Sequence, residues 1–152
     1  MKRLLLAAGA LLALLLGGCG VRPSDVITGG PAPAGTVEGT RFYLISDGQP
    51  AVVLRGLKPL KLDDVLRELA AGPTPAETKA GFTSEVPAGI TPTKVGIAGD
   101  GVLVSLSTDV RSLSVLATVQ IVCTVQAISG PTPVTLVNAS QTRGPLRCPV
   151  YR

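Results

Sequence analysis

The sequence has no histidine and no tryptophan, and it has only 2 tyrosines and 2 phenylalanines among 152 residues. Without histidine it lacks the commonest metal ligand and the commonest general base at neutral pH. Four aromatic rings are too few to form a platform on which nucleic-acid bases could stack. The sequence therefore predicts a protein that binds no metal, no cofactor and no nucleic acid.

Charge is also scarce once the first residues are set aside. The chain has 14 basic and 10 acidic residues, a formal net charge of +4. Lys2 and Arg3 carry the only charges in the first 18 residues, so 12 basic side chains remain against 10 acidic ones without them. A net charge of +2 is too small for the basic surface that binding to phosphates requires.

The first 19 residues have the pattern of an export signal. Lys2 and Arg3 form a positive start, and residues 4–16 contain only Leu, Ala and one Gly. The small residues Gly17 and Gly18 then precede Cys19. A positive start, an apolar run and a small-residue cleavage site are typical of a secretory signal, and the run is shorter than the roughly 18 residues of a membrane-spanning helix.

The cysteine after the small residues predicts a bacterial lipoprotein. The segment Leu16-Gly17-Gly18-Cys19 resembles a lipobox, in which the signal peptide (residues 1–18) is removed and the Cys19 thiol receives a diacylglycerol. Two buried acyl chains, such as palmitate, hold a protein far more firmly than one. We therefore expect a lipid anchor on the extracytoplasmic face of the cell membrane. The alternative is a simple secretory signal that leaves Cys19 free.

The chain from Cys19 onward divides into two regions of different composition. Residues 20–40 are dominated by Gly, Pro and small polar residues and show no apolar period, so residues 19–40 are interpreted as a lipidated cysteine and a flexible tether. Residues 41–152 form the predicted domain. In that domain Cys123 and Cys148 remain, and two cysteines outside the cytoplasm can form a disulfide. The alternative is a pair of unlinked, buried thiols.

Local patterns predict a mixture of strands and helices. Apolar runs on either side of turn residues indicate two hairpins, and Leu62, Val65, Leu66 and Leu69 lie on one helical face before Gly72 and Pro73 end the helix. Residues 74–89 are expected to form a loop in which Phe82 and Val86 contact the core. The predicted strands are residues 41–45, 51–54, 93–98, 102–106, 134–137 and 148–151.

Residues 112–129 are ambiguous. Val119, Ile121, Cys123, Val125 and Ala127 alternate with more polar residues, which favours a strand. The length of the uncharged run favours a helix packed on a sheet, and its Thr and Gln residues argue against a membrane span.

The sequence contains no recognisable catalytic motif. Asp63 and Asp64 are adjacent, but neighbouring helical positions point in different directions and cannot share a proton or a metal. A serine nucleophile would need a lysine as its base, and Lys58, Lys61, Lys79 and Lys94 lie in no Ser-x-x-Lys motif. Gly72-Pro73-Thr74-Pro75 is interpreted as a helix terminator rather than a ligand loop. The chain is therefore not expected to be an enzyme.

The middle of the chain resembles the GerMN domains of spore-germination proteins and actinobacterial lipoproteins. The resemblance covers about residues 41–151, includes the long segment 116–128, and rests mainly on Leu69-Ala70-Ala71-Gly72-Pro73-Thr74-Pro75-Ala76-Glu77, Gly81-Phe82-Thr83-Ser84-Glu85-Val86-Pro87-Ala88-Gly89 and Gly101-Val102-Leu103-Val104-Ser105-Leu106-Ser107. It implies a small α/β (α+β) domain with a sheet of about four to six strands and two helices on one face. It also implies that residues 112–129 are helical, and that Gly72, Pro73, Pro75 and Gly101 are structural motif residues.

The leading hypothesis is a non-enzymatic, membrane-anchored domain that binds another protein of the cell envelope. In some actinobacterial lipoproteins with this domain, such a partner is a sensor kinase, as the resemblance implies. The alternatives are a module that binds a cell-wall glycan or small ligand, and a small hydrolase that uses a Ser-Lys pair.

Overall fold

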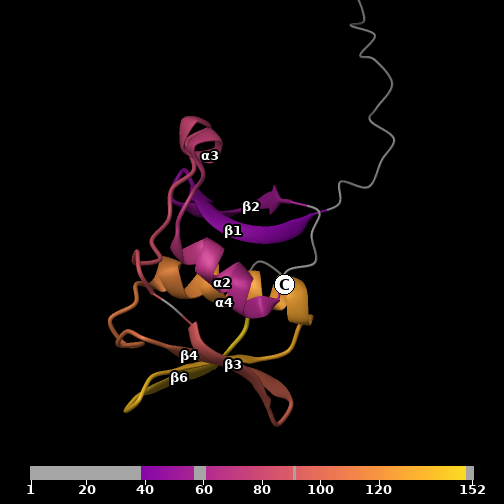
Figure 1. Ribbon diagram of the computed structural model, residues 1–152, viewed down its shortest axis with the longest axis vertical. Helices are drawn as coiled ribbons and strands as arrows, with labels where there is room; N and C mark the ends of the chain where they lie inside the picture. The colour runs from indigo at the N-terminus through magenta and orange to yellow at the C-terminus, as the bar shows by residue number, and fades with distance from the viewer. Residues whose placement is uncertain (1–38, 57–60, 91, 150–152) are drawn as a thin grey trace, which may run out of the picture. The chain divides into compact units, whose positions relative to one another are not determined.

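A computed structural model describes residues 39–56, 61–90 and 92–149 of the chain. These residues form a mixed α/β domain, as the sequence predicted, with strands that belong to two separate sheets (Figure 1). The elements are β1 (Thr40–Ser46), β2 (Gln49–Arg55), α2 (Leu62–Ala70), α3 (Pro75–Lys79), β3 (Pro92–Ala98), β4 (Gly101–Leu106), α4 (Val115–Ser129), β5 (Val134–Val137) and β6 (Thr142–Leu146).

The first sheet is the predicted hairpin of β1 and β2. The strands are antiparallel and meet at Ser46 and Gln49. Asp47 and Gly48 between them both have positive φ, at 51° and 71°. Asp-Gly is the preferred pair for such a two-residue turn, because both positions need left-handed backbone.

The second sheet has the strand order β3-β4-β5-β6. β3 with β4 and β5 with β6 are antiparallel, as expected of strands joined by short turns, whereas β4 and β5 are parallel. Parallel neighbours need a long crossover connection, and α4 provides it here. Side chains on β4 alternate in burial, so that Val102, Val104 and Leu106 face the core.

Helix α2 follows the predicted apolar face. Val65, Leu66 and Leu69 are buried and Leu62 is half-buried against them. Gly72 has a φ of +82° just beyond the helix. An L-residue with a side chain is strained in that conformation, so glycine ends the helix at low cost.

Helix α4 confirms the helical assignment of the ambiguous segment. It contacts β1 on one side and β5 on another, and α2 also packs against it. In Figure 1 both helices lie between the β1–β2 hairpin and the four-stranded sheet, so each sheet packs one face on the helices. The core is formed by these inward faces.

Two local predictions differ from the structure. Residues 75–79, expected in a loop, form the short helix α3, because Thr74 and Glu77 cap its first turn reciprocally and Pro75 occupies its start. The final strand is β6, not residues 148–151: Cys148 and Pro149 lie outside the strands, and residues 150–151 lie outside the described residues. Asn138 accepts hydrogen bonds from the backbone amides of Ser140 and Gln141, and this turn returns the chain to pair beside β5.

Candidate functional site

Cys19 and the tether lie outside the described residues. The lipidation site therefore stays a prediction from the sequence. None of the helices in the described part of the chain has the length and hydrophobicity that a membrane-spanning helix requires.

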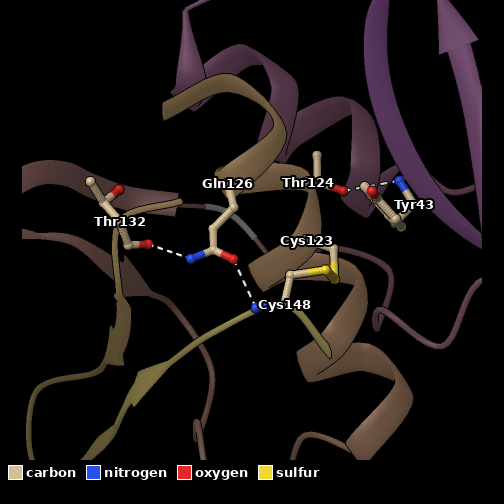
Figure 2. The surroundings of a disulfide bond; sticks show 6 residues. All are labelled: Tyr43, Cys123, Thr124, Gln126, Thr132 and Cys148. Carbon is tan, nitrogen blue, oxygen red and sulfur yellow. Dashed lines mark hydrogen bonds between the residues drawn. A yellow bond between two sulfur atoms is a disulfide. The ribbon is translucent and has the colours of Figure 1, made fainter. Parts of the chain in front are cut away.

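The predicted cysteine pair forms a disulfide in the structure. Cys123 on α4 and Cys148 after β6 are joined, with their Cα atoms 4.7 Å apart (Figure 2). Both residues are buried. Gln126, one turn along α4, accepts a hydrogen bond from the Cys148 amide and donates one to the Thr132 carbonyl. The disulfide and the amide together hold the segment after β6 against α4.

The motif residues Gly72 and Pro75 have structural roles, and Pro73 lies between them. Gly72 ends α2, and Pro75 begins α3 where the backbone needs no amide donor. Between them, the Thr74 hydroxyl accepts a hydrogen bond from the Glu77 amide, while the Glu77 carboxylate accepts one from the Thr74 amide. This capping box fixes the connection between the two helices.

Gly101 is needed for a close backbone approach rather than for a special conformation. A Cβ atom at this position would lie 2.8 Å from the carbonyl oxygen of Pro133, closer than real Cβ contacts allow. That carbonyl accepts a hydrogen bond from the Val102 amide at 2.8 Å. The contact aligns the start of β4 with β5.

Arg55 at the end of β2 contacts the segment that contains Gly72, Pro73 and Pro75. Its guanidinium makes two hydrogen bonds to the carboxylate of Glu77, at 2.9 and 2.6 Å. It also donates to the carbonyl oxygens of Glu68 and Gly72 at the end of α2, and it lies 4.6 Å from the centre of the Phe42 ring. One side chain thus joins β2, the end of α2 and α3.

This cluster also changes the acidity of Glu77. The hydrogen bonds from Arg55 hold the pKa of the Glu77 carboxyl below its ordinary value of 4.5, and they outweigh the opposing effect of burial. The carboxylate is therefore ionised throughout the neutral range. Sequence reasoning missed Arg55, although the Thr74-Pro75-Ala76-Glu77 capping sequence was a readable sign that Glu77 is oriented.

A second polar cluster lies on the buried surface of α4. The Gln120 amide donates to the Tyr43 carbonyl at 3.0 Å and accepts from the Glu85 amide at 2.8 Å. One turn along, the Thr124 hydroxyl accepts from the Tyr43 amide at 3.0 Å (Figure 2). These side chains provide hydrogen-bond partners for the amide and carbonyl of Tyr43, which face the edge of β1 opposite β2.

An apolar hollow lies between the β3–β4 hairpin and the end of α4. Its volume is about 470 Å³. Ile97, which is 87% exposed, and Ile128, which is 39% exposed, lie at its mouth. Leu62, Val95 and Val102 contribute further apolar lining.

Chemically reactive groups do not gather at any of these places. Within residues 39–56, 61–90 and 92–149, no three His, Cys, Asp or Glu side chains lie close enough to hold a metal ion. Lys61, Lys79 and Lys94 are exposed, whereas a lysine that activates a serine has to be desolvated. Lys58 lies outside the described residues. The described clusters are suited to holding segments together and to presenting surfaces.

Comparison with known proteins agrees with this architecture. The chain is similar in fold to the tandem GerMN domains of the sporulation protein GerM from Bacillus subtilis, with a TM-score of 0.51 and 16% identity. The similarity covers 76% of this chain and 43% of that one, so this chain spans less than half of the GerM structure. No curated protein matches the chain.

The family comparison covers the larger part of the chain. A family model named Germane, described as sporulation and spore germination, matches residues 41–138. The match includes the Arg55–Glu77 cluster, both hairpins and α4, and it ends before β6 and Cys148. Because the matched region is well over half of the sequence, the chain belongs to the Germane family of sporulation and spore-germination domains.

Proposed function

We propose that this protein is a lipid-anchored lipoprotein whose GerMN-type domain binds another protein of the cell envelope and catalyses no reaction. The observation that carries the anchor is the order of residues at the start of the chain. A positive start and an apolar run end in Gly17, Gly18 and Cys19, which is the arrangement of a lipoprotein signal. The anchor would place the domain on the extracytoplasmic face of the membrane.

The tether predicted from the sequence supports a role in which the domain reaches a partner. About 20 residues rich in Gly and Pro separate Cys19 from β1. A flexible chain of that length has a typical end-to-end distance of about 25 Å. The domain could therefore contact the extracytoplasmic part of a membrane protein such as a sensor kinase, because both would lie within that distance of the bilayer.

The anchor is tested by membrane fractionation of the full chain after labelling cells with radioactive palmitate. Wild type should be labelled and sediment with membranes, whereas Cys19→Ala should be unlabelled and released or incompletely processed. Cys123→Ala is the matched control, because it also removes a cysteine but should leave labelling unchanged. Normal labelling of Cys19→Ala would disprove the anchor.

Partner binding is tested separately, by affinity capture of the tagged, anchored chain from solubilised membranes. The expected result is one reproducible envelope protein that is captured with wild type and lost with Cys19→Ala. Repeated capture of no protein would contradict partner binding while leaving the anchor intact.

The apolar hollow beside Ile97 and Ile128 favours a second candidate, a small-ligand binding module. Its volume of about 470 Å³ lies within the range of small-molecule sites, and its apolar lining suits a lipophilic ligand better than a glycan. An apolar fluorescent dye should then bind wild type and bind Ile128→Asp much more weakly. Val115→Asp, which changes another exposed residue of the same helix, is the control. Equal dye binding by all three proteins would exclude this candidate.

A further inference from the structure

The β1–β2 hairpin has two outer edges, and their backbone groups can be assigned from the hydrogen bonds of β1. The amide and carbonyl of Tyr43 both bond to α4 side chains, and those of Ile45 both bond to Thr83. Both residues therefore point their backbone groups away from β2. In an antiparallel pair, a residue opposite such a position also points its amide and carbonyl outward.

The register then identifies the open groups on β2. Tyr43 pairs with Val52 and Arg41 pairs with Leu54, so the amides and carbonyls of Val52 and Leu54 point to the outer edge of β2. In the described part of the chain no strand pairs with that edge. The side chains of Val52 and Leu54 are 46% and 41% exposed. The edge thus combines unpaired backbone groups with exposed apolar side chains.

The free edges of the other sheet are protected in ways that β2 is not. Edge strands that avoid pairing commonly carry proline or charged residues. β3 carries Pro92 and Lys94, and β6 carries Arg143 and Pro145. On β2 a proline occurs only at the turn end, and the remaining outward positions are Val52 and Leu54. Of these edges, that of β2 is the one suited to strand addition.

We propose that the outer edge of β2 pairs antiparallel with β2 of a second copy of this chain, centred on Val52–Leu54. Each copy would offer the same outward donors and acceptors, so a two-fold axis lets them satisfy one another. The exposed side chains of Val52 and Leu54 would then pack across the axis.

Charge favours a second copy as the occupant. Arg55 is the one charged residue in β2, and its guanidinium already bonds to Glu77. Pairing two copies of β2 therefore brings no unpaired like charges together, whereas like charges directly opposite are destabilising in sheets.

The contact would be small and reversible. Stable protein complexes bury about 1,600 Å², and a single short strand offers less than that. We therefore expect an equilibrium between monomer and dimer that shifts with concentration. The pairing concerns the described domain and does not depend on the lipid anchor or on an envelope partner.

The test is thiol-specific cross-linking of the full chain in detergent. Val52→Cys, treated with a short bis-maleimide, should give a covalent dimer whose yield rises with protein concentration. Ile97→Cys is the matched control, because Ile97 is more exposed and lies on an edge strand of the other sheet. Wild type corrects for any reaction at Cys19.

A second substitution separates pairing from random collision. Leu54→Pro, added to Val52→Cys, removes an outward amide from each copy but no bond to β1. The symmetric dimer therefore loses two hydrogen bonds, which should lower the dimer yield about 30-fold at low protein concentration. If its circular dichroism shows unfolding, Leu54→Lys replaces it. Equal dimer yields from Val52→Cys and Ile97→Cys would overturn the proposal. So would cross-linking of Val52→Cys in membranes to a different protein.

Discussion

Helices α2 and α4 bury different kinds of surface within the same core. α2 is amphipathic: Val65, Leu66 and Leu69 face inward, while Asp63 and Arg67 are exposed. α4 carries no charge and buries polar side chains as well as apolar ones, namely Thr118, Gln120, Thr124 and Gln126. α2 therefore contributes mainly by apolar packing, whereas α4 also hydrogen-bonds to segments that have no strand beside them.

The polar side chains of α4 allow one helix to join separate parts of a small domain. Gln120 and Thr124 bond to the backbone of Tyr43 in β1, and Gln120 also bonds to Glu85 in the segment after α3. Gln126 and Cys123 hold Cys148. If this comparison is right, substitutions on the buried surface of α4 should cost much more than those on the exposed surface of α2.

The largest expected effect is loss of the disulfide. The double substitution Cys123→Ala with Cys148→Ala opens a link between residues 25 apart, which should lower the free energy of unfolding by about 3.5 kcal/mol. Urea denaturation followed by circular dichroism measures the change. The reduced wild-type protein is the control and should lose a similar amount. A change below about 1 kcal/mol would mean that the disulfide between α4 and the segment after β6 contributes little to stability.

Gln120→Leu should have the next largest effect. It removes the Gln120 hydrogen bonds to the buried Tyr43 carbonyl and to the part-buried Glu85 amide, and losing both should cost about 2 to 3 kcal/mol. The measurement is again urea denaturation. Gln49→Leu, the same substitution at an exposed site, should change stability little. Equal losses for the two variants would contradict the proposed role of α4.

Glu77→Gln should lower the free energy of unfolding by about 2 kcal/mol at pH 7, because it replaces charge-assisted hydrogen bonds to Arg55. The folded-state pKa of Glu77 is lowered, so its contribution is complete above the unfolded value of 4.5 and is lost as the pH falls through the lower folded value. Denaturation curves at several pH values should therefore show the two proteins converging in acid.

Glu68→Gln is the control for this pH dependence, because Arg55 contacts the backbone carbonyl of Glu68 and the substitution changes only the side chain. It should differ little from wild type at any pH. A constant difference between Glu77→Gln and wild type down to strongly acidic pH would show that the ionised carboxylate is not the stabilising form.

The smallest effect is expected on the exposed surface of α2. Arg67→Ala breaks the ion pair with Asp64, and both side chains are largely exposed. Exposed pairs contribute about 0.5 kcal/mol or less. Thermal or urea denaturation should show a change within that range. A loss as large as that of Gln120→Leu would remove the contrast between the two helices.

Sequence reasoning succeeded where local signals and burial agree. The Asp47-Gly48 turn and the apolar stripe of α2 both follow from the conformational preference of a few neighbouring residues. The cysteine pair was predicted because Cys19 was assigned to lipid and two cysteines remained. The mixed class was predicted from the alternation of hairpins and helices.

It was less successful where distant contacts decide. The alternation in residues 119–127 favoured a strand, because Gln120, Thr124 and Gln126 interrupt the apolar period of a helix. In the structure these three side chains are nevertheless buried, and each forms hydrogen bonds to the backbone of Tyr43, Cys148 or Thr132. Arg55 gave no local sign of its role, since its partners lie 13 to 22 residues away. The last strand was misplaced because Gly144 and Pro145 are unusual in strands and are tolerated at an edge.

The order of residues and their short-range preferences were enough to predict an export signal, the likeness to a GerMN domain and the local elements. The export signal stays a prediction, because Cys19 and the residues before it lie outside the described residues. The tertiary structure decided that the strands divide into two sheets, that α4 turns polar side chains inward, and that Arg55 joins β2 to α2 and α3. It also showed which edge of the hairpin is covered. A buried polar group is stable only when it has a hydrogen-bond partner. These partners are distant in the sequence, so they come together only when the chain folds.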